Sequence, residues 1–231
     1  EYMDYEKYNV DLLIFSHKGE LMKLIPNKVN ILPEVSTYTV YRKSVVQCLK
    51  EGLYATSAVR LICKNIALVK NKNRKLTEGP GYIQMQLTSK YLSYLMPKIR
   101  KKYDLAISYA WPHDFIANRV YADKKIAWIH TDFSMLEIDS KIDTHIWDKF
   151  NYIASISDEC TNAFLKKYPT LKNKIQLIEN INSPKFIKDM SLESIGYEKI
   201  TNAFNIVSVG RLSYAKGFDN AIQALRILHD K

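Results

Sequence analysis

The sequence predicts an α/β fold in which helices cover both faces of a parallel sheet. Short apolar runs alternate with longer segments of helical periodicity along most of the chain. Hydrophobic residues make up 47% and charged residues 25% of the 231 residues, which is typical of a globular protein. No apolar run is longer than the four residues seen at 12–15, whereas a membrane-spanning helix needs about 20.

The predicted elements follow in chain order. Strands are expected at 10–15 and 29–32, with a short helix at 20–25 between them. Two long helical segments, 40–72 and 83–102, are separated by Gly79-Pro80-Gly81, which strongly favours a break. The remaining predicted strands are 104–109, 125–130, 152–155 and 174–178, and the remaining helices are 114–121, 141–150 and 158–167.

The periodicity fails at 183–202, a polar stretch that we interpret as a linker between a first domain, 1–182, and a second domain, 203–231. The second domain opens with a strand at 204–209 and a helix at 216–229. One strand and one helix cannot bury a core. The chain also begins without Met. We therefore expect a fragment of a longer protein.

Cysteine usage and missing motifs also indicate the cellular compartment and argue against several enzyme classes. The three cysteines, Cys48, Cys63 and Cys160, form no zinc or CxxC pattern, and no signal peptide opens the chain. These features predict a soluble, cytoplasmic protein. The GxGxxG, GxxxxGK[ST], GxSxG and HExxH motifs are absent, which argues against dehydrogenases, P-loop NTPases, serine hydrolases and zinc proteases. We expect neither a cofactor nor a metal.

The turn between the last predicted strand and helix is the most informative stretch, VGRLSYAKG at 209–217. Free backbone N–H groups and the dipole of a helix N-terminus attract phosphate. Arg211 can grip phosphate oxygens with two parallel bonds, and Lys216 adds a mobile charge. Gly210 and Gly217 allow a ligand to approach the backbone closely. By spacing alone, however, a turn with two solvated cations is the more frequent arrangement.

This stretch, VGRLSYAKGFDNAIQAL, resembles the signature that opens the second domain of family 4 glycosyltransferases, which are retaining enzymes of the GT-B fold. Looser similarity in KKIAWIHTDF, IASISDECTNAF and IQLIENIN extends the resemblance over most of 104–231. It implies two Rossmann-like domains, the first on the acceptor side and the second on the donor side. It also implies that Gly210, Arg211, Lys216 and Gly217 bind the donor diphosphate.

The implied reaction is transfer of a hexose from a UDP- or GDP-hexose to a glycan or lipid-linked acceptor in the synthesis of surface polysaccharide or glycolipid. The resemblance implies that the first strand of the first domain, with the family's glycine-rich loop after it, would precede Glu1 and that the Glu-x7-Glu motif would follow Lys231. On this basis we expect the 231-residue chain alone to be inactive. A sugar-nucleotide epimerase of GT-B type, which uses the same diphosphate turn without an acceptor, remains an alternative.

His130 ends the predicted strand 125–130, at the sheet edge where ligands of such folds bind. If the strand continues, Asp132 points to the same side. A histidine in a cleft can bond a hydroxyl or transfer a proton, although spacing alone favours a loop histidine at a strand end. The resemblance implies a histidine against the donor sugar. We therefore take His130 and Asp132 as catalytic candidates.

Two further cleft candidates are Ser157 and Asn180. Ser157 and Asp158 stand at the start of the helix predicted at 158–167, and by position either is more simply its N-cap. The resemblance implies that the serine lies near the cleft. Asn180 stands where the family commonly has Asn-Gly-Val-Asp, but this chain reads Asn180-Ile181-Asn182 and departs from that pattern.

The positive charge is concentrated between residues 41 and 75, where Glu51 is the only acid. The segment holds nine cations: Arg42, Lys43, Lys50, Arg60, Lys64, Lys70, Lys72, Arg74 and Lys75. Apolar residues recur at helical spacing, among them Val46, Leu49, Leu61, Ile62 and Val69. These are either ordinary surface helices or helices that dock on an anionic membrane, such as the inner face of the plasma membrane. A non-catalytic α/β module that docks to membrane or to a partner through these basic helices is therefore a further alternative. Nucleic-acid binding is not expected.

Overall fold

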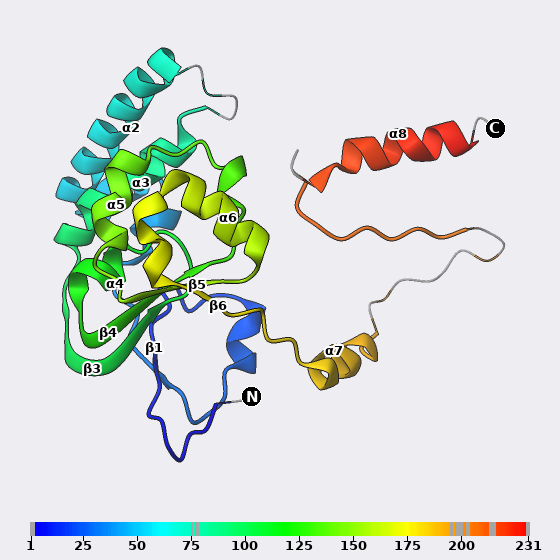
Figure 1. Cartoon of the computed structure of the whole chain (residues 1–231), viewed down its shortest axis with the longest axis horizontal. Helices are drawn as coiled ribbons and strands as arrows, with labels where there is room; N and C mark the ends of the chain where they lie inside the picture. The colour runs from blue at the N-terminus through cyan, green and yellow to red at the C-terminus, as the bar shows by residue number, and fades with distance from the viewer. Residues whose placement is uncertain are drawn as a thin grey trace. The chain divides into compact units, whose positions relative to one another are not determined.

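The computed structural model describes residues 3–74, 76, 79–194, 196, 201, 204–212 and 216–229. The chain divides into two compact units, Glu1–Asn180 and Ile181–Lys231. The first unit combines helices with two sheets, and all the paired strands are parallel (Figure 1). The predicted α/β class with a parallel sheet is therefore confirmed.

The main sheet has four strands in sequential order: β3 (Ile99–Ser108), β4 (Val120–Ile129), β5 (Tyr152–Ser155) and β6 (Ile175–Leu177). They are connected through α4 (Asp114–Arg119), then η3 (Phe133–Met135) and α5 (Ser140–Trp147), then α6 (Asp158–Lys167) and η4 (Pro169–Lys174). Such crossovers are what parallel neighbours require. A smaller sheet pairs β1 (Asp11–Leu12) with β2 (Asn30–Ile31), and η1 (Glu20–Leu24) lies between them in the chain.

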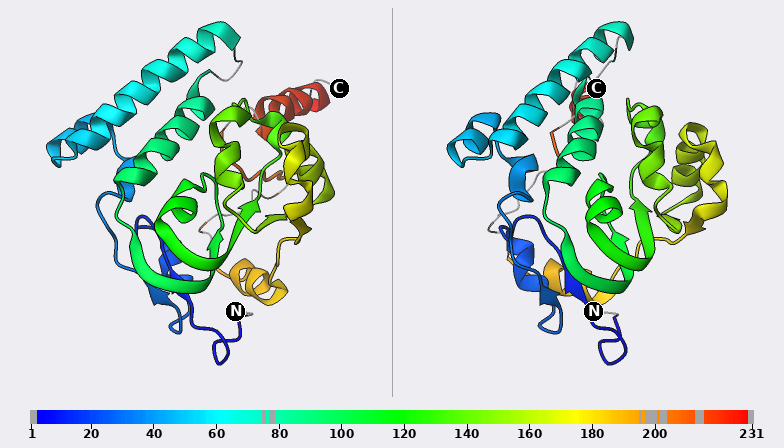
Figure 2. Two further views of the ribbon diagram at one scale, coloured as in Figure 1. Left: turned by 60° about the vertical axis from the view of Figure 1, so that its left-hand side comes forward. Right: turned by 90° about the vertical axis from the view of Figure 1, so that its left-hand side faces the viewer.

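The two faces of the main sheet differ. Ala106, Ala127 and Ile153 point to one face, where they are at most 7% exposed, and Figure 2 shows helices on that side of the curved sheet. Alternate strand residues point the other way, and Leu105 and Ile107 of β3 are there 46% and 43% exposed. Along β3, the prediction that helices cover both faces is therefore not met.

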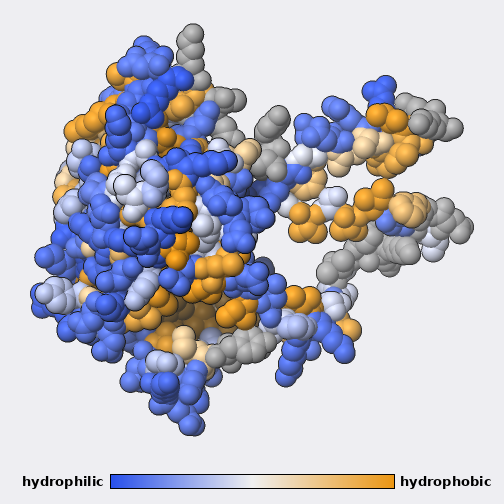
Figure 3. All heavy atoms as spheres, viewed as in Figure 1, coloured by the Kyte–Doolittle hydropathy of each residue, from blue (hydrophilic) through white to orange (hydrophobic). Residues whose placement is uncertain are grey.

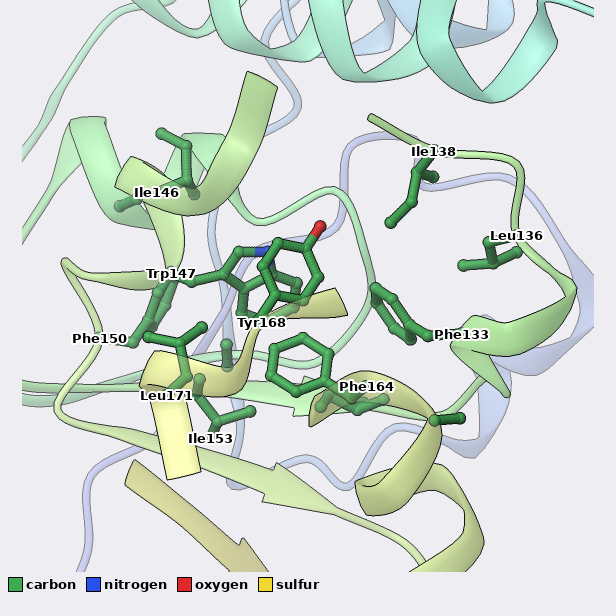
Figure 4. Close-up of a cluster of buried hydrophobic side chains, with 14 residues drawn as sticks. Phe133, Leu136, Ile138, Ile146, Trp147, Phe150, Ile153, Phe164, Tyr168 and Leu171 are labelled. Atoms are coloured by element: carbon green, nitrogen blue, oxygen red, sulfur yellow. The ribbon is translucent and has the colours of Figure 1, made fainter. Parts of the chain in front are cut away.

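One buried cluster beneath the helices contains five aromatic rings among aliphatic side chains (Figure 4). Phe164 of α6 packs edge-on against Phe133 and Trp147, with ring centroids 5.0 and 4.8 Å away, and lies 4.7 Å from Tyr168. All four side chains are at most 2% exposed. Such pairs stabilise the fold beyond the area they bury.

The N-terminal half contains more breaks than the sequence predicts. After η2 (Thr39–Arg42), the predicted helix 40–72 is divided into α1 (Val45–Lys50) and α2 (Tyr54–Arg74). Gly52, between them, has φ of +74°, a conformation that glycine adopts without steric cost. The helix predicted at 83–102 is α3 (Gly81–Leu95), and residues 99–102 instead begin β3. Met96 precedes Pro97 and is extended, as the proline ring requires, so the helix stops there.

The second unit departs from two predictions. The predicted linker contains a helix, α7 (Pro184–Ser191), whose N-cap Ser183 accepts a hydrogen bond from the Phe186 amide at 3.2 Å. Pro184 at the first helical position suits this start. Residues 204–209 are not a strand, because none of the residues described pairs with them. The last predicted helix is confirmed as α8 (Phe218–His229).

One buried carboxylate ties α2 to α5. Lys70 Nζ and Arg74 Nη2 lie 2.9 and 3.0 Å from Oδ2 of Asp139, whose side chain is 4% exposed. Its Oδ1 accepts a hydrogen bond from the Lys141 amide at 3.3 Å and caps α5. Burial raises the pKa of Asp139, but the two cations outweigh burial and hold it below its usual value.

We predict that Asp139→Ala lowers the free energy of unfolding by about 1–2 kcal/mol, because a helix cap and a partner of two cations are lost. Since the pKa of Asp139 is lowered on folding, this stabilisation is present at neutral pH and disappears as acid protonates the folded carboxylate. Urea denaturation measures the loss. Asp123→Ala is the matched control: its pair with Lys102 is more than half exposed and should contribute less than about 0.5 kcal/mol. Equal losses in the two variants would contradict the prediction.

Candidate functional site

The carboxyl ends of β3, β4 and β5 meet at one edge of the main sheet. Ser108 pairs with Ala127, and Ile129 pairs with Ser155. The residues that follow these strands are therefore neighbours at this edge, which is where open parallel sheets bind ligands.

His130 lies at this edge, in an aromatic setting. Its ring centroid is 4.3 Å from that of Tyr109 and 6.0 Å from that of Trp128, to which it is nearly parallel. The side chain of His130 is half-buried. Its Nε2 atom is buried and, among the described residues, has no hydrogen-bond partner. Within the described part of the chain, this nitrogen is therefore left without a partner, and a ligand could bond it only after a covering side chain has moved.

Of the other three candidates in the first unit, Asp132 and Ser157 cap helices. β4 ends at Ile129, so the chain does not carry Asp132 along the strand beside His130. Asp132 instead caps η3: its Oδ1 accepts a hydrogen bond from the Ser134 amide at 2.8 Å, and hydrogen bonds from Ser134 lower its pKa. Ser157 caps α6, where its Oγ accepts from the Cys160 amide at 3.2 Å. Asn180 is exposed in a segment without regular structure.

A buried polar cluster lies after β3. None of its residues was predicted as a site residue from the sequence. His113 is 2% exposed, and its Nδ1 lies 2.8 Å from Ser108 Oγ. Burial, with a smaller contribution from the charge of His130, lowers the pKa of His113 to about 3, so the ring is neutral at physiological pH. Asp114 accepts a hydrogen bond from Ser89 Oγ at 2.7 Å, and burial raises its pKa to about 6. The signal available in the sequence was the Pro-His-Asp triplet at 112–114, which begins three residues after the end of the predicted strand 104–109.

Asp114 gives a pH-dependent prediction. Because the folded pKa of about 6 lies above the ordinary 3.8, the wild type loses stability as pH rises from about 4 to 6, and the loss is complete above pH 6. Asp114→Asn has no such ionisation and still accepts the bond from Ser89. The free energy of unfolding of the variant minus that of the wild type should therefore rise over this range, by about 1.4 kcal/mol for each pH unit between the two pKa values. Urea titrations at pH 4.5 and 7.5 measure it, and a difference independent of pH would contradict it.

The diphosphate-binding candidates lie together in the turn before α8, of which the structure describes 209–212 and 216–217. A side-chain carbon on Gly210 would lie 3.3 Å from the Phe218 ring and 3.5 Å from Lys216 Cγ, so the turn folds back on itself closely. Gly217 has φ of +60° and immediately precedes the helix. Arg211 and Lys216 are exposed. Ser213, Tyr214 and Ala215 lie outside the described residues.

The cations of the basic segment 41–75 divide between internal contacts and the surface. Lys43 pairs with Glu51 at 2.6 Å, Arg60 donates to the Val40 carbonyl at 3.0 Å, and Lys70 and Arg74 hold Asp139. Arg42, Lys50, Lys64 and Lys72 are exposed, and Lys75 lies outside the described residues. About half of these cations therefore contribute to internal contacts rather than to a charged surface.

The described residues contain no cluster of three or more His, Cys, Asp or Glu side chains that could hold a metal ion. In the same part of the chain, no helix has both the length and the apolar character needed to cross a membrane. Comparison with known proteins finds no matching family model, no matching curated protein and no matching solved structure.

Proposed function

We propose that this chain is part of a retaining glycosyltransferase of the GT-B fold, similar to family 4, that transfers a hexose from a nucleotide sugar to a glycan or lipid-linked acceptor. The turn at 209–217 carries the proposal. It combines Gly-Arg-Leu with Lys-Gly, folds closely at Gly210, and leads through a left-handed Gly217 into the N-terminus of α8. The parallel α/β fold of the first unit suits the acceptor-side domain of such an enzyme.

The proposed roles follow from charge. As the bond between sugar and phosphate breaks, negative charge builds up on the departing diphosphate. Arg211 and Lys216, with the free N–H groups at the start of α8, would neutralise it. His130 would orient a sugar hydroxyl through Nε2. Neutral His113, bonded to Ser108, would hold the loop after β3 in position near His130.

The test is incubation of the full-length protein with UDP- and GDP-hexoses, with and without a membrane extract that supplies acceptors. Release of nucleoside diphosphate that depends on the extract, reduced in His130→Ala, would support a transferase. A new epimer of the sugar without any acceptor would instead identify an epimerase. A folded protein that changes none of these donors would overturn the proposal.

A second candidate function is docking to an anionic lipid surface, and the outward face of α2 favours it. The residues of α2 that pack inward are small, among them Ser57, Cys63 and Ala67, whereas large apolar side chains face outward. Tyr54, Leu61, Ile62, Leu68 and Val69 are 40–69% exposed. Hydrophobic side chains are interspersed with hydrophilic ones along α2 in Figure 3. The helix contains no acidic residue, and Lys64 and Lys72 are exposed on it. Such a combination is typical of helices that lie in an anionic membrane interface.

Flotation with vesicles tests this candidate. The protein should float with vesicles of phosphatidylglycerol and phosphatidylcholine but not with phosphatidylcholine alone. The double variant Ile62→Asp, Val69→Asp should lose the association, whereas Leu21→Asp, at a side chain 75% exposed in η1, should keep it. No flotation of the wild type, or equal loss in both variants, would argue against membrane docking.

A further inference from the structure

Three aromatic rings project from the same face of the main sheet at its carboxyl edge. Trp128 lies in β4 and His130 directly follows its last residue; their rings are nearly parallel, with centroids 6.0 Å apart, so they lie on the same side of the sheet. Tyr109 follows Ser108, which pairs with Ala127, so the register places Tyr109 beside Trp128. The ring centroids of Tyr109 and Trp128 are 5.4 Å apart, and those of Tyr109 and His130 are 4.3 Å apart.

The cluster has two properties that ordinary packing does not require. Its outer member, Tyr109, is 60% exposed, and Ile107 on the same face of β3 is 43% exposed. Two polar atoms of the inner rings, Trp128 Nε1 and His130 Nε2, are buried without a hydrogen-bond partner among the described residues. Buried polar atoms nearly always have a hydrogen-bond partner, so two such atoms without a partner at one site need an explanation.

We propose that Tyr109, Trp128 and His130 form a binding platform for a sugar ring of the acceptor glycan, an inference that rests on the proposed transferase function and assigns His130 to the acceptor rather than to the donor sugar. A pyranose has an apolar face of C–H groups and a rim of hydroxyls. The apolar face would stack on an aromatic ring, and adjacent hydroxyls would bond Nε1 of Trp128 and Nε2 of His130.

Tyr109 would control access to the platform. It packs on both inner rings, and because its own side chain is largely exposed, rotation about its side-chain bonds is fast and needs no movement of the core. Rotation would uncover the two nitrogens for the hydroxyls, and the ring would then close against the sugar. The specificity is for adjacent hydroxyls on a ring with an apolar face, which is a property of hexoses.

The test is a titration of the full-length protein with the methyl glycosides of glucose, galactose and mannose, followed by tryptophan fluorescence. At least one glycoside should bind and change the emission. Tyr109→Ala should weaken that binding at least tenfold, and Trp128→Phe, which keeps a ring but removes the N–H donor, should weaken it about three- to tenfold. Tyr121→Ala is the matched control, because Tyr121 is a 72% exposed tyrosine of the same strand pair outside the cluster.

Titration of the same proteins with UDP and GDP separates the two hypotheses. Unchanged nucleotide affinity in Tyr109→Ala, together with lost glycoside affinity, would support the platform. Nucleotide binding without any glycoside binding, or glycoside binding that Tyr109→Ala leaves unchanged, would overturn the platform and leave the proposed function standing. Absence of nucleotide binding would count against the proposed function itself.

Discussion

Arg211→Ala weakens the binding of a nucleoside diphosphate to the full-length protein by about 10- to 100-fold, if the turn before α8 is the diphosphate site. A guanidinium makes two parallel bonds to phosphate oxygens, and a hydrogen bond to a charged group contributes roughly 1.5–3 kcal/mol. Lys216→Ala should weaken binding less, because an ammonium is a point charge with no fixed two-bond geometry. The dissociation constants of the three proteins, measured by calorimetry, provide the comparison.

The control for this series is Lys188→Ala, which removes an exposed cation from α7 in the same unit. It should leave the dissociation constant unchanged, which would show that the loss in Arg211→Ala is not a general effect of net charge. Equal dissociation constants for Arg211→Ala and Lys216→Ala would argue against bidentate hydrogen bonding of Arg211 to the phosphate. If both Arg211→Ala and Lys216→Ala bind the nucleoside diphosphate with wild-type affinity, the turn is not part of its binding site.

Phe164→Ala should lower the free energy of unfolding by about 3–5 kcal/mol, the usual loss when a fully buried phenylalanine is truncated. Phe164 is 0% exposed and lies within 5.0 Å, centroid to centroid, of Phe133, Trp147 and Tyr168 (Figure 4). Its removal would leave a cavity between α6 and the helices packed beside it, and rigid rings cannot easily fill that cavity. Urea denaturation followed by circular dichroism measures the change.

Met135→Ala is the control for Phe164→Ala. Met135 lies two residues from Phe133 in η3, but its side chain is 64% exposed, so truncation should change the free energy of unfolding by less than about 0.5 kcal/mol. A loss below about 1 kcal/mol in Phe164→Ala would mean that this aromatic cluster does not form the core of the first unit.

The elements that were predicted most accurately have signals contained in a few neighbouring residues. The strand at 152–155 and the helix at 158–167 match β5 and α6 residue for residue. A short apolar run marks the first, and a capping serine followed by acidic residues marks the start of the second. The predictions that failed depend on contacts between residues that are distant in the sequence. Whether 204–209 forms a strand depends on a pairing partner, which no local pattern supplies.

Packing partners also explain what the sequence could not indicate about α2. Its apolar periodicity correctly predicts a helix, and large apolar residues normally face a core. In the structure, Cys63 and Ala67 instead pack against Ile83 and Leu87 of α3, and the larger residues face outward. Small residues permit close helix packing, but periodicity alone does not say which face is used.

For the candidate site, the sequence correctly placed His130 after a strand, at the carboxyl edge of the sheet, but did not indicate most of the side chains around it. The position of His130 after a strand followed from the α/β pattern. The cluster around Asp114 was missed because its contacts are distant in sequence: Ser89 reaches Asp114 across 25 residues, as Tyr168 reaches Asp143. Only the register of β3 with β4 places Tyr109 beside Trp128.

The most direct test of the central claim is calorimetric titration of the full-length protein with UDP, GDP and their hexose conjugates, with Arg211→Ala in parallel. The proposed function predicts that one nucleotide family binds, that the hexose conjugate binds as well, and that Arg211→Ala weakens both at least tenfold. If a folded wild-type protein binds none of these ligands, the turn at 209–217 is not a donor site. The glycosyltransferase proposal would then be wrong, and membrane docking through α2 would become the leading hypothesis.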